Sequence, residues 1–215
     1  MTDAQLRAEL AERGIVAVLR ADSAERAVAA ARALAQGGVT AIEVTFSVPE
    51  APSAIAELAT DESLLVGAGT VLSADQVDAA VHAGARFLVS PNLDEQVLDA
   101  AERRGVPALP GVLTPTEVAR AARRCSVMKL FPASLGGPAL LAALREPFPG
   151  LAFVPTGGVT AAGIGDWLRA GAVAVGAGGD LCPREAIEAG DAEQLRARAR
   201  RYAAAFAEVA RHPIP

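Results

Sequence analysis

The sequence has few of the residues that build metal sites and disulfide frameworks. Its 215 residues include two cysteines and two histidines. The cysteines, Cys125 and Cys182, lie far apart and form no CxxC motif. Structural zinc sites and disulfide scaffolds need more such residues at closer spacing. We therefore expect two free thiols in the core and no zinc site.

Blocks of positive charge and long apolar runs are also lacking. The formal net charge is -5, and no basic run with interleaved aromatic residues suggests binding to nucleic acid or an anionic membrane. The longest uncharged stretch, residues 147–165, is broken by Pro149, Pro155, Gly157 and Gly158, so it cannot form a continuous membrane helix. The first residues are polar rather than signal-like. The sequence predicts a cytoplasmic protein with neither of these partners.

What the sequence does contain is an internal repeat. An alanine-rich helical pattern ends at a glycine, and an apolar β-branched run follows. Each glycine fits a helix C-cap. The separations are close to whole multiples of about 22 residues, the length of one strand, one helix and short loops. The repeated glycines are Gly14, Gly38, Gly84, Gly105 and Gly171.

The repeat predicts one α/β domain over residues 1–215, folded as a single (β/α)8 TIM barrel with an extra N-terminal helix. Continuous apolar strands between amphipathic helices are typical of a parallel sheet. An open doubly wound sheet is the alternative, but its glycine-rich dinucleotide motif is missing after the first strand. Helix N-caps are expected at Ser23, Ser73, Thr114 and Thr160. Strands are expected near 14–20, 39–45, 64–69, 86–90, 106–110, 126–131, 152–155 and 172–176.

A lysine interrupts one of the apolar strands. Lys129 lies within the segment 126–132, where it must lose much of its hydration. Burial disfavours the ammonium form, and a neutral amine can attack a ketone to give an iminium that accepts electrons. A lysine that reaches solvent, or forms a structural ion pair, is the alternative. We predict that Lys129 is a Schiff-base nucleophile at the carboxyl end of the barrel.

A glutamate interrupts a second apolar strand. Strand alternation places Glu43 and Thr45 on the face that lines the barrel interior, and Ile42 and Val44 on the face toward the helices. A carboxylate near an apolar wall suits the transfer of protons between a substrate hydroxyl and its carbonyl form. A purely structural pairing with a buried cation is the alternative. We predict that Glu43 is the general acid–base.

Other polar residues follow the ends of the predicted strands. Arg20 ends the first strand, and its planar guanidinium suits a substrate carboxylate, although a surface arginine is the alternative. Thr70 ends the third strand. The last two strands end in glycine-rich loops, 155–160 and 176–180, where this fold binds phosphate through backbone N–H groups. Tight turns are the alternative for either loop alone. Together they predict a small-molecule substrate with an anionic, phosphorylated end.

At these residues the sequence resembles the bacterial 2-keto-3-deoxy-6-phosphogluconate (KDPG) aldolase family, which includes 4-hydroxy-2-oxoglutarate (KHG) aldolases. The resemblance spans nearly the whole chain and rests on segments 18–20, 42–45, 67–70, 89–91, 109–111, 128–132 and 155–159. It implies that Lys129 forms the Schiff base and Glu43 transfers protons. It further implies a homotrimer in carbohydrate metabolism, in the Entner–Doudoroff pathway, with no metal and no organic cofactor. The predicted substrate contacts are Arg20, Thr45, Thr70, Pro91, Phe131, Thr156, Gly157, Gly158, Gly178 and Gly179.

The resemblance predicts a class I aldolase that cleaves KDPG to pyruvate and glyceraldehyde 3-phosphate, and KHG to pyruvate and glyoxylate. Two departures from the family pattern matter. Ser47 stands where some members have arginine, so the contact to the substrate carboxylate would fall to Arg20. Gly179 stands where many members have a serine hydroxyl, which leaves room for a different or unphosphorylated aldehyde end. The galactonate epimer of KDPG is an alternative substrate, because the choice of epimer depends on fine details of pocket shape.

Three other classes of protein remain as alternatives. A phosphate-binding barrel isomerase or synthase would not use Lys129 as a nucleophile. A metabolite-binding barrel without turnover would keep the pocket alone. A metal-dependent aldolase is disfavoured because the sequence offers no convincing cluster of histidines and carboxylates.

Overall fold

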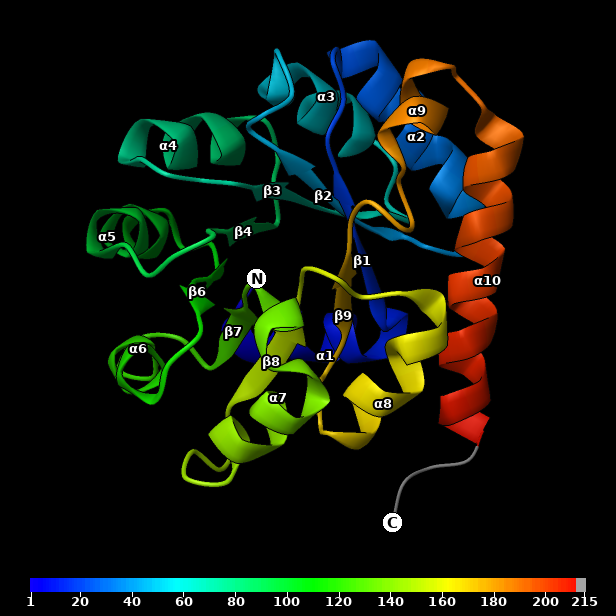
Figure 1. The fold of residues 1–215 in the computed structure, drawn as a ribbon. Coiled ribbons are helices and arrows are strands. Elements are labelled where there is room, and N and C mark those ends of the chain that lie inside the picture. Colours follow the sequence, from blue (N-terminus) through cyan, green and yellow to red (C-terminus); the bar gives the residue numbers. More distant parts are fainter. Residues whose placement is uncertain (212–215) are drawn as a thin grey trace.

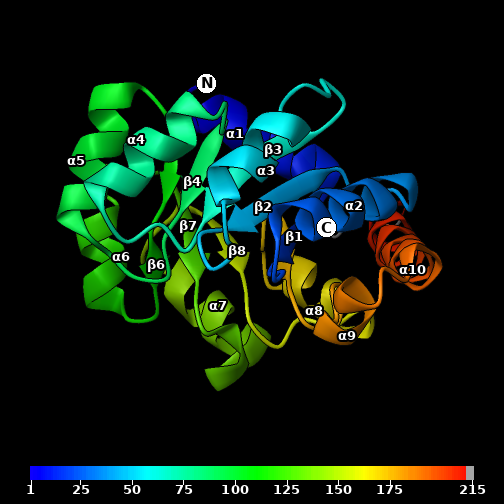
Figure 2. The same cartoon turned by 90° about the horizontal axis from the view of Figure 1, so that it is seen from above.

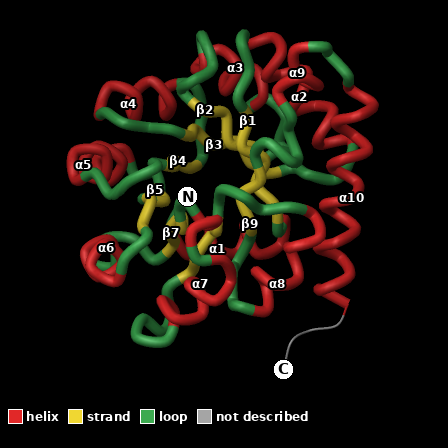
Figure 3. Tube along the Cα trace, in the orientation of Figure 1, coloured by secondary structure: helices red, strands yellow, loops and turns green. Residues whose placement is uncertain are grey.

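The computed structural model describes residues 1–211, in which helices follow most of the strands along the chain. The strands gather at the centre and the helices surround them (Figure 1 and Figure 3). No helix within residues 1–211 is long and apolar enough to cross a membrane. The strands are β1 (Ile15–Leu19), β2 (Ala41–Thr45), β3 (Leu65–Gly69), β4 (Phe87–Val89), β5 (Ala108–Leu109), β6 (Gly111–Val112), β7 (Val127–Leu130), β8 (Ala152–Pro155) and β9 (Val175–Ala177). The helices are α1 (Asp3–Arg13), α2 (Ala24–Gln36), α3 (Ala51–Leu58), α4 (Ala74–His82), α5 (Glu95–Arg104), α6 (Pro115–Ala121), α7 (Gly137–Arg145), α8 (Ile164–Arg169), α9 (Arg184–Glu188) and α10 (Ala192–Arg211), with the 3-10 helices η1 (Ala133–Leu135) and η2 (Ala161–Gly163).

The paired strands are parallel and form two sheets. Six strands lie in the order β5-β4-β3-β2-β1-β9, and three lie in the order β6-β7-β8. Parallel pairing confirms the predicted α/β class, because parallel neighbours require crossover connections such as the helices. The sheets approach each other at two places. Pro110 lies between β5 and β6 in the chain, and Thr156, just after β8, forms an isolated bridge with Gly176 of β9.

The strands differ from the prediction in number and position. The sheet pairing of residues 1–211 gives nine strands and does not show one closed eight-stranded barrel. The strand expected at 106–110 divides at Pro110 into β5 and β6, because proline lacks the N–H that continues a ladder. The last strand begins later than expected, since β9 spans Val175–Ala177 instead of 172–176.

The two faces of the strands belong to separate hydrophobic clusters. Ala41 packs in an inner cluster, whereas Ile42 and Val44 pack in an outer cluster with residues of the helices. Because side chains alternate along a strand, Glu43 and Thr45 lie on the inner face with Ala41. This arrangement confirms the predicted orientation of β2.

Helix α1 covers the end of the strands where their amino termini lie. Its buried residues, Leu6 and Leu10, belong to the inner cluster. The helix lies behind the strands in Figure 1, and Figure 2 shows it on the side opposite α7 and α9. The predicted extra N-terminal helix is therefore present, and it fills the inner face from one end.

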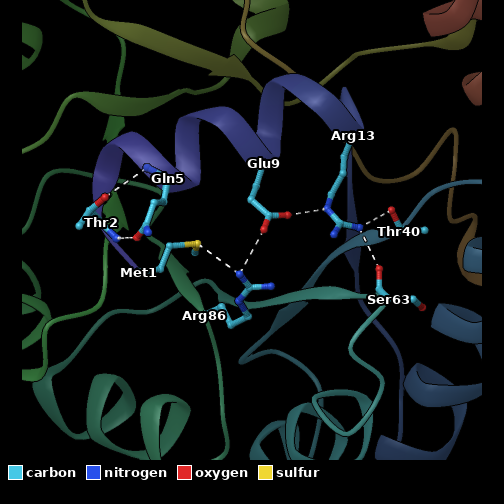
Figure 4. Close-up of polar contacts among 8 residues, drawn as sticks. All are labelled: Met1, Thr2, Gln5, Glu9, Arg13, Thr40, Ser63 and Arg86. Atoms are coloured by element: carbon cyan, nitrogen blue, oxygen red, sulfur yellow. Dashed lines mark hydrogen bonds and ion pairs between the residues drawn. The ribbon is translucent and has the colours of Figure 1, made fainter.

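Polar contacts tie α1 to the segments that precede three strands (Figure 4). Arg13 donates to Thr40 Oγ1 at 2.6 Å and to the Ser63 carbonyl at 2.9 Å, just before β2 and β3. Glu9 accepts from Arg13 at 3.1 Å and from Arg86, the residue before β4, at 3.2 Å. These contacts hold the helix against the amino ends of the strands.

Most predicted helix boundaries are confirmed. Ser23, Ser73 and Thr114 each accept a hydrogen bond from the backbone N–H three residues later. Thr160 precedes the short helix η2 and makes no such bond, so the predicted side-chain cap is wrong there. The repeated glycines all have positive φ near helix ends, as a C-terminal cap requires; they are Gly14, Gly38, Gly84, Gly105 and Gly171.

Candidate active site

A buried lysine and a buried glutamate face each other from the two sheets. Lys129 Nζ of β7 lies 3.7 Å from Glu43 Oε1 of β2, and the side chains are 5% and 3% exposed. The two atoms lie within ion-pair distance but are farther apart than in a hydrogen bond. Glu43 Oε1 has no hydrogen-bond partner among the described residues. A buried oxygen of this kind is costly to keep and is typical of a functional site.

A glycine at the end of β3 makes room for the glutamate. A Cβ at Gly69 would lie 2.0 Å from Glu43 Oε1, so a larger residue would displace the carboxylate. The next residue, Thr70, has a φ of 54°, a left-handed conformation that a β-branched residue adopts at a cost. Strain of this kind concentrates at functional sites. The segment 67–70 therefore shapes the site through its backbone.

The ring of Phe131 forms a wall beside the lysine. Lys129 Nζ lies 5.2 Å from the ring centroid, within the range of a cation–π contact. The same ring approaches the glycine loop after β8, since a Cβ at Gly157 would lie 3.5 Å from Phe131 Cε2. Phe131 thus lies between the lysine and this loop.

The loop after β8 depends on glycines, both within the loop and in the neighbouring strand β9. The hydroxyl of Thr156 donates to the Val154 carbonyl at 3.3 Å. A Cβ at Gly176 would lie 2.2 Å from Thr156 Oγ1, so glycine in β9 is needed to admit the threonine. Gly157 and Gly158 have φ of 96° and 78°, values that few other residues adopt. The chain therefore turns sharply at the carboxyl end of β8.

A cavity of about 490 Å³ opens beside the carboxyl ends of β1, β2 and β9. It brings Arg20 to the second glycine loop, because a Cβ at Gly178 would lie 3.8 Å from Arg20 Nη1. Arg184 adds a second guanidinium to the lining and Asp22 adds one carboxylate, a balance that favours an anionic ligand. The lining residues are Val18, Arg20, Ala21, Asp22, Ser47, Pro49, Gly178, Gly179, Cys182 and Arg184.

Two of the predicted substrate contacts, Thr45 and Pro91, lie against the backbone of neighbouring strands. Thr45 is fully buried; its hydroxyl donates to the Leu19 carbonyl at 2.8 Å and lies 2.6 Å from Ser47 Oγ. Pro91 is half-buried, and a Cβ at Gly111 would lie 2.2 Å from its carbonyl group. Gly111 pairs with Lys129 in the sheet. Pro91 therefore lies one strand away from the lysine, while Thr45 joins β2 to β1.

Sequence reasoning missed two polar residues that follow the carboxyl ends of strands. Arg184 forms an ion pair of 2.6 Å with Glu188 on its own helix, a pattern common on exposed helices, and the fold alone brings it to the cavity. Ser90 is 4% exposed and donates to the Val71 carbonyl at 2.8 Å. Its position after an apolar strand was the signal that could have identified it.

A second cavity of about 490 Å³ lies at the opposite end of the strands, beside the start of α1 and Arg124. Arg124 donates there to Glu95, Asp99 and Glu102 at 3.1, 2.7 and 2.6 Å. Its charge is already paired within the chain. We therefore place the candidate site at the carboxyl ends of the strands, where the buried lysine and glutamate lie.

Both cysteines are free and buried, as predicted. Burial raises the pKa of Cys182, in the cavity lining, and of Cys125 to about 12. Both thiols therefore keep their protons near neutral pH and are poor nucleophiles. Within residues 1–211, no group of three or more histidine, cysteine or carboxylate side chains is placed to hold a metal ion.

The chain is similar to proteins of known activity. Residues 6–198 match the KDPG and KHG aldolase family model. The chain is 39% identical over 186 residues to the 2-dehydro-3-deoxy-phosphogluconate aldolase of Treponema pallidum, covering 85% of this chain and 89% of that protein. It is 38% identical over 189 residues to the KHG/KDPG aldolase of Escherichia coli, covering 86% and 89%. The crystal structure of the Legionella pneumophila KDPG aldolase, with pyruvate captured as a covalent carbinolamine intermediate, gives a TM-score of 0.85 at 30% identity, covering 93% of this chain and 97% of that one.

Proposed function

The chain belongs to the KDPG and KHG aldolase family, and from this premise we propose that Lys129 forms a Schiff base with a 2-keto acid while Glu43 transfers the protons. The chain is accordingly an aldehyde-lyase, and its substrate is KDPG, cleaved to pyruvate and glyceraldehyde 3-phosphate. The observation that carries the proposal is the buried pair itself, with Lys129 Nζ 3.7 Å from Glu43 Oε1. An amine and a proton acceptor lie within reach of one carbonyl carbon.

The reaction begins at the C2 ketone. The neutral Lys129 amine attacks C2, the carbinolamine loses water, and an iminium forms. Glu43 takes the proton of the C4 hydroxyl, and the electrons of the C3–C4 bond move into the iminium to give an enamine. The C4 fragment leaves as the aldehyde. Glu43 then returns the proton to C3, and water hydrolyses the pyruvyl iminium to release pyruvate and the free amine.

The remaining predicted contacts would hold the two ends of the substrate. Arg20 and Thr70 would bind the pyruvyl carboxylate, and Pro91 and Phe131 would line the reacting centre. The loops that follow β8 and β9 would bind the phosphate through backbone N–H groups. The proximity of Arg20 to Gly178 means that the arginine could also meet the phosphate. Gly179, in the cavity lining, leaves open space at this end, since an added Cβ there would meet nothing within 4 Å.

KHG is the second candidate substrate. The family description and the name of the Escherichia coli relative both include KHG aldolase. The same lysine chemistry applies, because KHG also carries a 2-ketone and a C4 hydroxyl. Its aldehyde product, glyoxylate, has no phosphate, and Gly179 contributes no hydroxyl that would be left unpaired.

We further propose that the two sheets act as one closed (β/α)8 barrel, with β5 and β6 serving as a single interrupted strand. The bridge between Thr156 and Gly176 supports this closure. One aldolase domain would span residues 1–215, of which 212–215 lie outside the described residues. A homotrimer follows from the family resemblance alone, and light scattering tests it. A cytoplasmic location follows from the sequence features described above, and cell fractionation tests it.

Covalent trapping tests the proposed chemistry. Borohydride added with pyruvate should attach a reduced pyruvyl group to Lys129, detected by peptide mass spectrometry. Lys129→Ala should give no adduct and no pyruvate release from KDPG. Lys129 is the one lysine of the sequence, so no other lysine side chain can be trapped. Any adduct elsewhere would involve only the N-terminal amine. Turnover of KDPG without a trapped lysine adduct would reject the Schiff-base mechanism.

A further inference from the structure

One tyrosine bridges the two glycine loops from outside the strands. The hydroxyl of Tyr202, on α10, lies 2.7 Å from Asp180 Oδ2 and 3.1 Å from the Val159 carbonyl. Val159 directly follows Gly157 and Gly158, and Asp180 directly follows Gly178 and Gly179. A single side chain therefore contacts the end of both loops. The tyrosine is 1% exposed, whereas the Asp180 side chain is 38% exposed.

A second residue of α10 holds the same aspartate. Arg198 donates to the Asp180 carbonyl at 2.6 Å, and its guanidinium lies 3.9 Å from Asp180 Oδ1. Arg198 and Tyr202 are four residues apart, so they project from one face of the helix. The loop after β9 is thus fixed to α10 at its backbone and at its side chain.

Helix α10 is itself firmly seated. Its buried residues include Leu195, Ala199 and Tyr202. A Cβ at Gly37, at the end of α2, would lie 2.4 Å from the Ala199 Cβ, so the two helices meet at a glycine that allows close approach. Tyr202 therefore projects from a support that cannot shift easily relative to the strands.

We propose that Tyr202, together with Asp180, is a positioning residue that fixes the separation of the two glycine loops and thereby sets the preference for phosphorylated 2-keto acids. This inference rests on the proposed function. Gly179 offers no side-chain hydroxyl, so the contacts of the two loops with the phosphate come from their backbone N–H groups. Such groups bind one phosphate only when their spacing is right, because small misplacements cost much of the binding energy.

The hydrogen bond from Tyr202 to Asp180 persists because the tyrosine hydroxyl stays protonated. Burial and the hydrogen bond to Asp180 raise the pKa of Tyr202, so the hydroxyl keeps its proton throughout the physiological range. Its one proton can be donated to the aspartate, and a hydrogen bond to a charged acceptor is stronger than one between neutral groups. The Val159 carbonyl is the second acceptor beside the same hydroxyl.

Substrate discrimination tests the role of Tyr202. Tyr202→Phe removes the hydroxyl and keeps the ring, and it should raise the KM for KDPG about tenfold through loss of one charge-assisted hydrogen bond. The KM for KHG should rise less than about twofold, because KHG has no phosphate for the loops to hold. The kcat for KDPG should stay within about twofold of wild type. Trapping of pyruvate on Lys129 should proceed at the wild-type rate.

Two further variants keep the test decisive. Asp180→Ala removes the same hydrogen bond from the side of the loop and should raise the KM for KDPG as Tyr202→Phe does; it provides the test if Tyr202→Phe fails to fold. Asp180→Asn keeps a hydrogen-bond acceptor and should retain most of the preference for KDPG over KHG. Ser126→Ala, which removes a hydroxyl contact to Asp3 of 3.1 Å at the opposite end of the strands, is the matched control.

The possible outcomes separate two failures. Equal rises in the KM for KDPG and KHG, or a substrate ratio no different from that of Ser126→Ala, would overturn the positioning role. A wild-type enzyme with no preference for KDPG over KHG would overturn it as well. Absence of the pyruvate adduct in the wild-type protein would instead overturn the proposed function.

Discussion

The amino and carboxyl ends of the strands differ in how well their buried groups are satisfied. At the amino end, Leu6 and Leu10 fill the inner face, and Arg13 and Glu9 are paired with neighbouring residues. At the carboxyl end, Glu43 Oε1 is buried with no hydrogen-bond partner among the described residues. One end therefore gains stability from satisfied contacts, and the other gives it up. This division is what the proposed barrel predicts, since the chemistry of such folds lies at the carboxyl ends of the strands.

The sharpest way to break this comparison is Glu43→Gln at the carboxyl end. The amide cannot take up the substrate proton, so kcat for KDPG should fall between about a hundredfold and ten-thousandfold. The fold should be retained, because the size of the side chain is kept. Steady-state kinetics and thermal unfolding measure both quantities. The matched control is Glu12→Gln, which removes an exposed carboxylate from α1 and should leave kcat at its wild-type value. Wild-type turnover in Glu43→Gln would remove the glutamate from its catalytic role.

The buried pair was predictable because each residue breaks a local pattern. Lys129 and Glu43 are charged residues within apolar strands, and strand alternation alone gives their direction. Arg184 breaks no such pattern, because a charged residue that starts a surface helix is ordinary. Tyr202 also looks like a core residue of an amphipathic helix. Their contacts depend on how distant segments pack, which one sequence does not specify.

The division of the fifth strand shows another limit. Pro110 was visible in the sequence, yet the prediction placed it at the end of one strand, 106–110. Periodicity identifies that a strand exists, whereas a break in its ladder depends on which neighbour each half meets. Here β5 pairs with β4, and β6 pairs with β7. The proline lies where the chain passes from one sheet to the other.

Leu6→Ala probes the amino end. Truncation of this fully buried side chain should lower the free energy of unfolding by about 2–5 kcal/mol through lost burial and a cavity. Below the unfolding transition, kcat should stay near the wild-type value, because Leu6 lies far from the reacting atoms. Leu6→Met keeps the volume and should cost less than about 1.5 kcal/mol. A large loss of kcat in a folded Leu6→Ala protein would mean that the two ends are coupled.

Arg184→Gln compares an exposed residue at the carboxyl end with the buried Lys129–Glu43 pair. Arg184 lines the cavity but is exposed and paired with Glu188, so its contribution to phosphate binding should be screened by water. We expect the KM for KDPG to rise about threefold to tenfold, with a smaller effect at high salt. Arg169→Gln, which removes a similar ion pair with Asp166 on α8, is the control. An equal effect of the two substitutions would show that Arg184 does not meet the substrate.

The smallest expected effect concerns pH and the amino end. Partial burial acts to raise the pKa of Glu9, but hydrogen bonds and attraction from Arg13 and Arg86 outweigh it, so the pKa lies below its ordinary value of 4.5. A carboxyl group with a lowered pKa in the folded state stabilises the fold above its unfolded pKa. That contribution should be lost as the pH falls from above 4.5 through the lower folded value.

Glu9→Gln tests this contribution. Because the ion pairs are largely solvated, the difference in unfolding free energy between wild type and Glu9→Gln should be about 0.5 kcal/mol or less near neutral pH. It should shrink toward zero in acid, where the wild-type carboxylate also becomes protonated. Denaturant unfolding at a series of pH values measures the difference, and Glu12→Gln on the same helix should show no such trend. A difference that grows in acid would reverse the sign of the linkage and show that the paired carboxylate does not hold α1 in place.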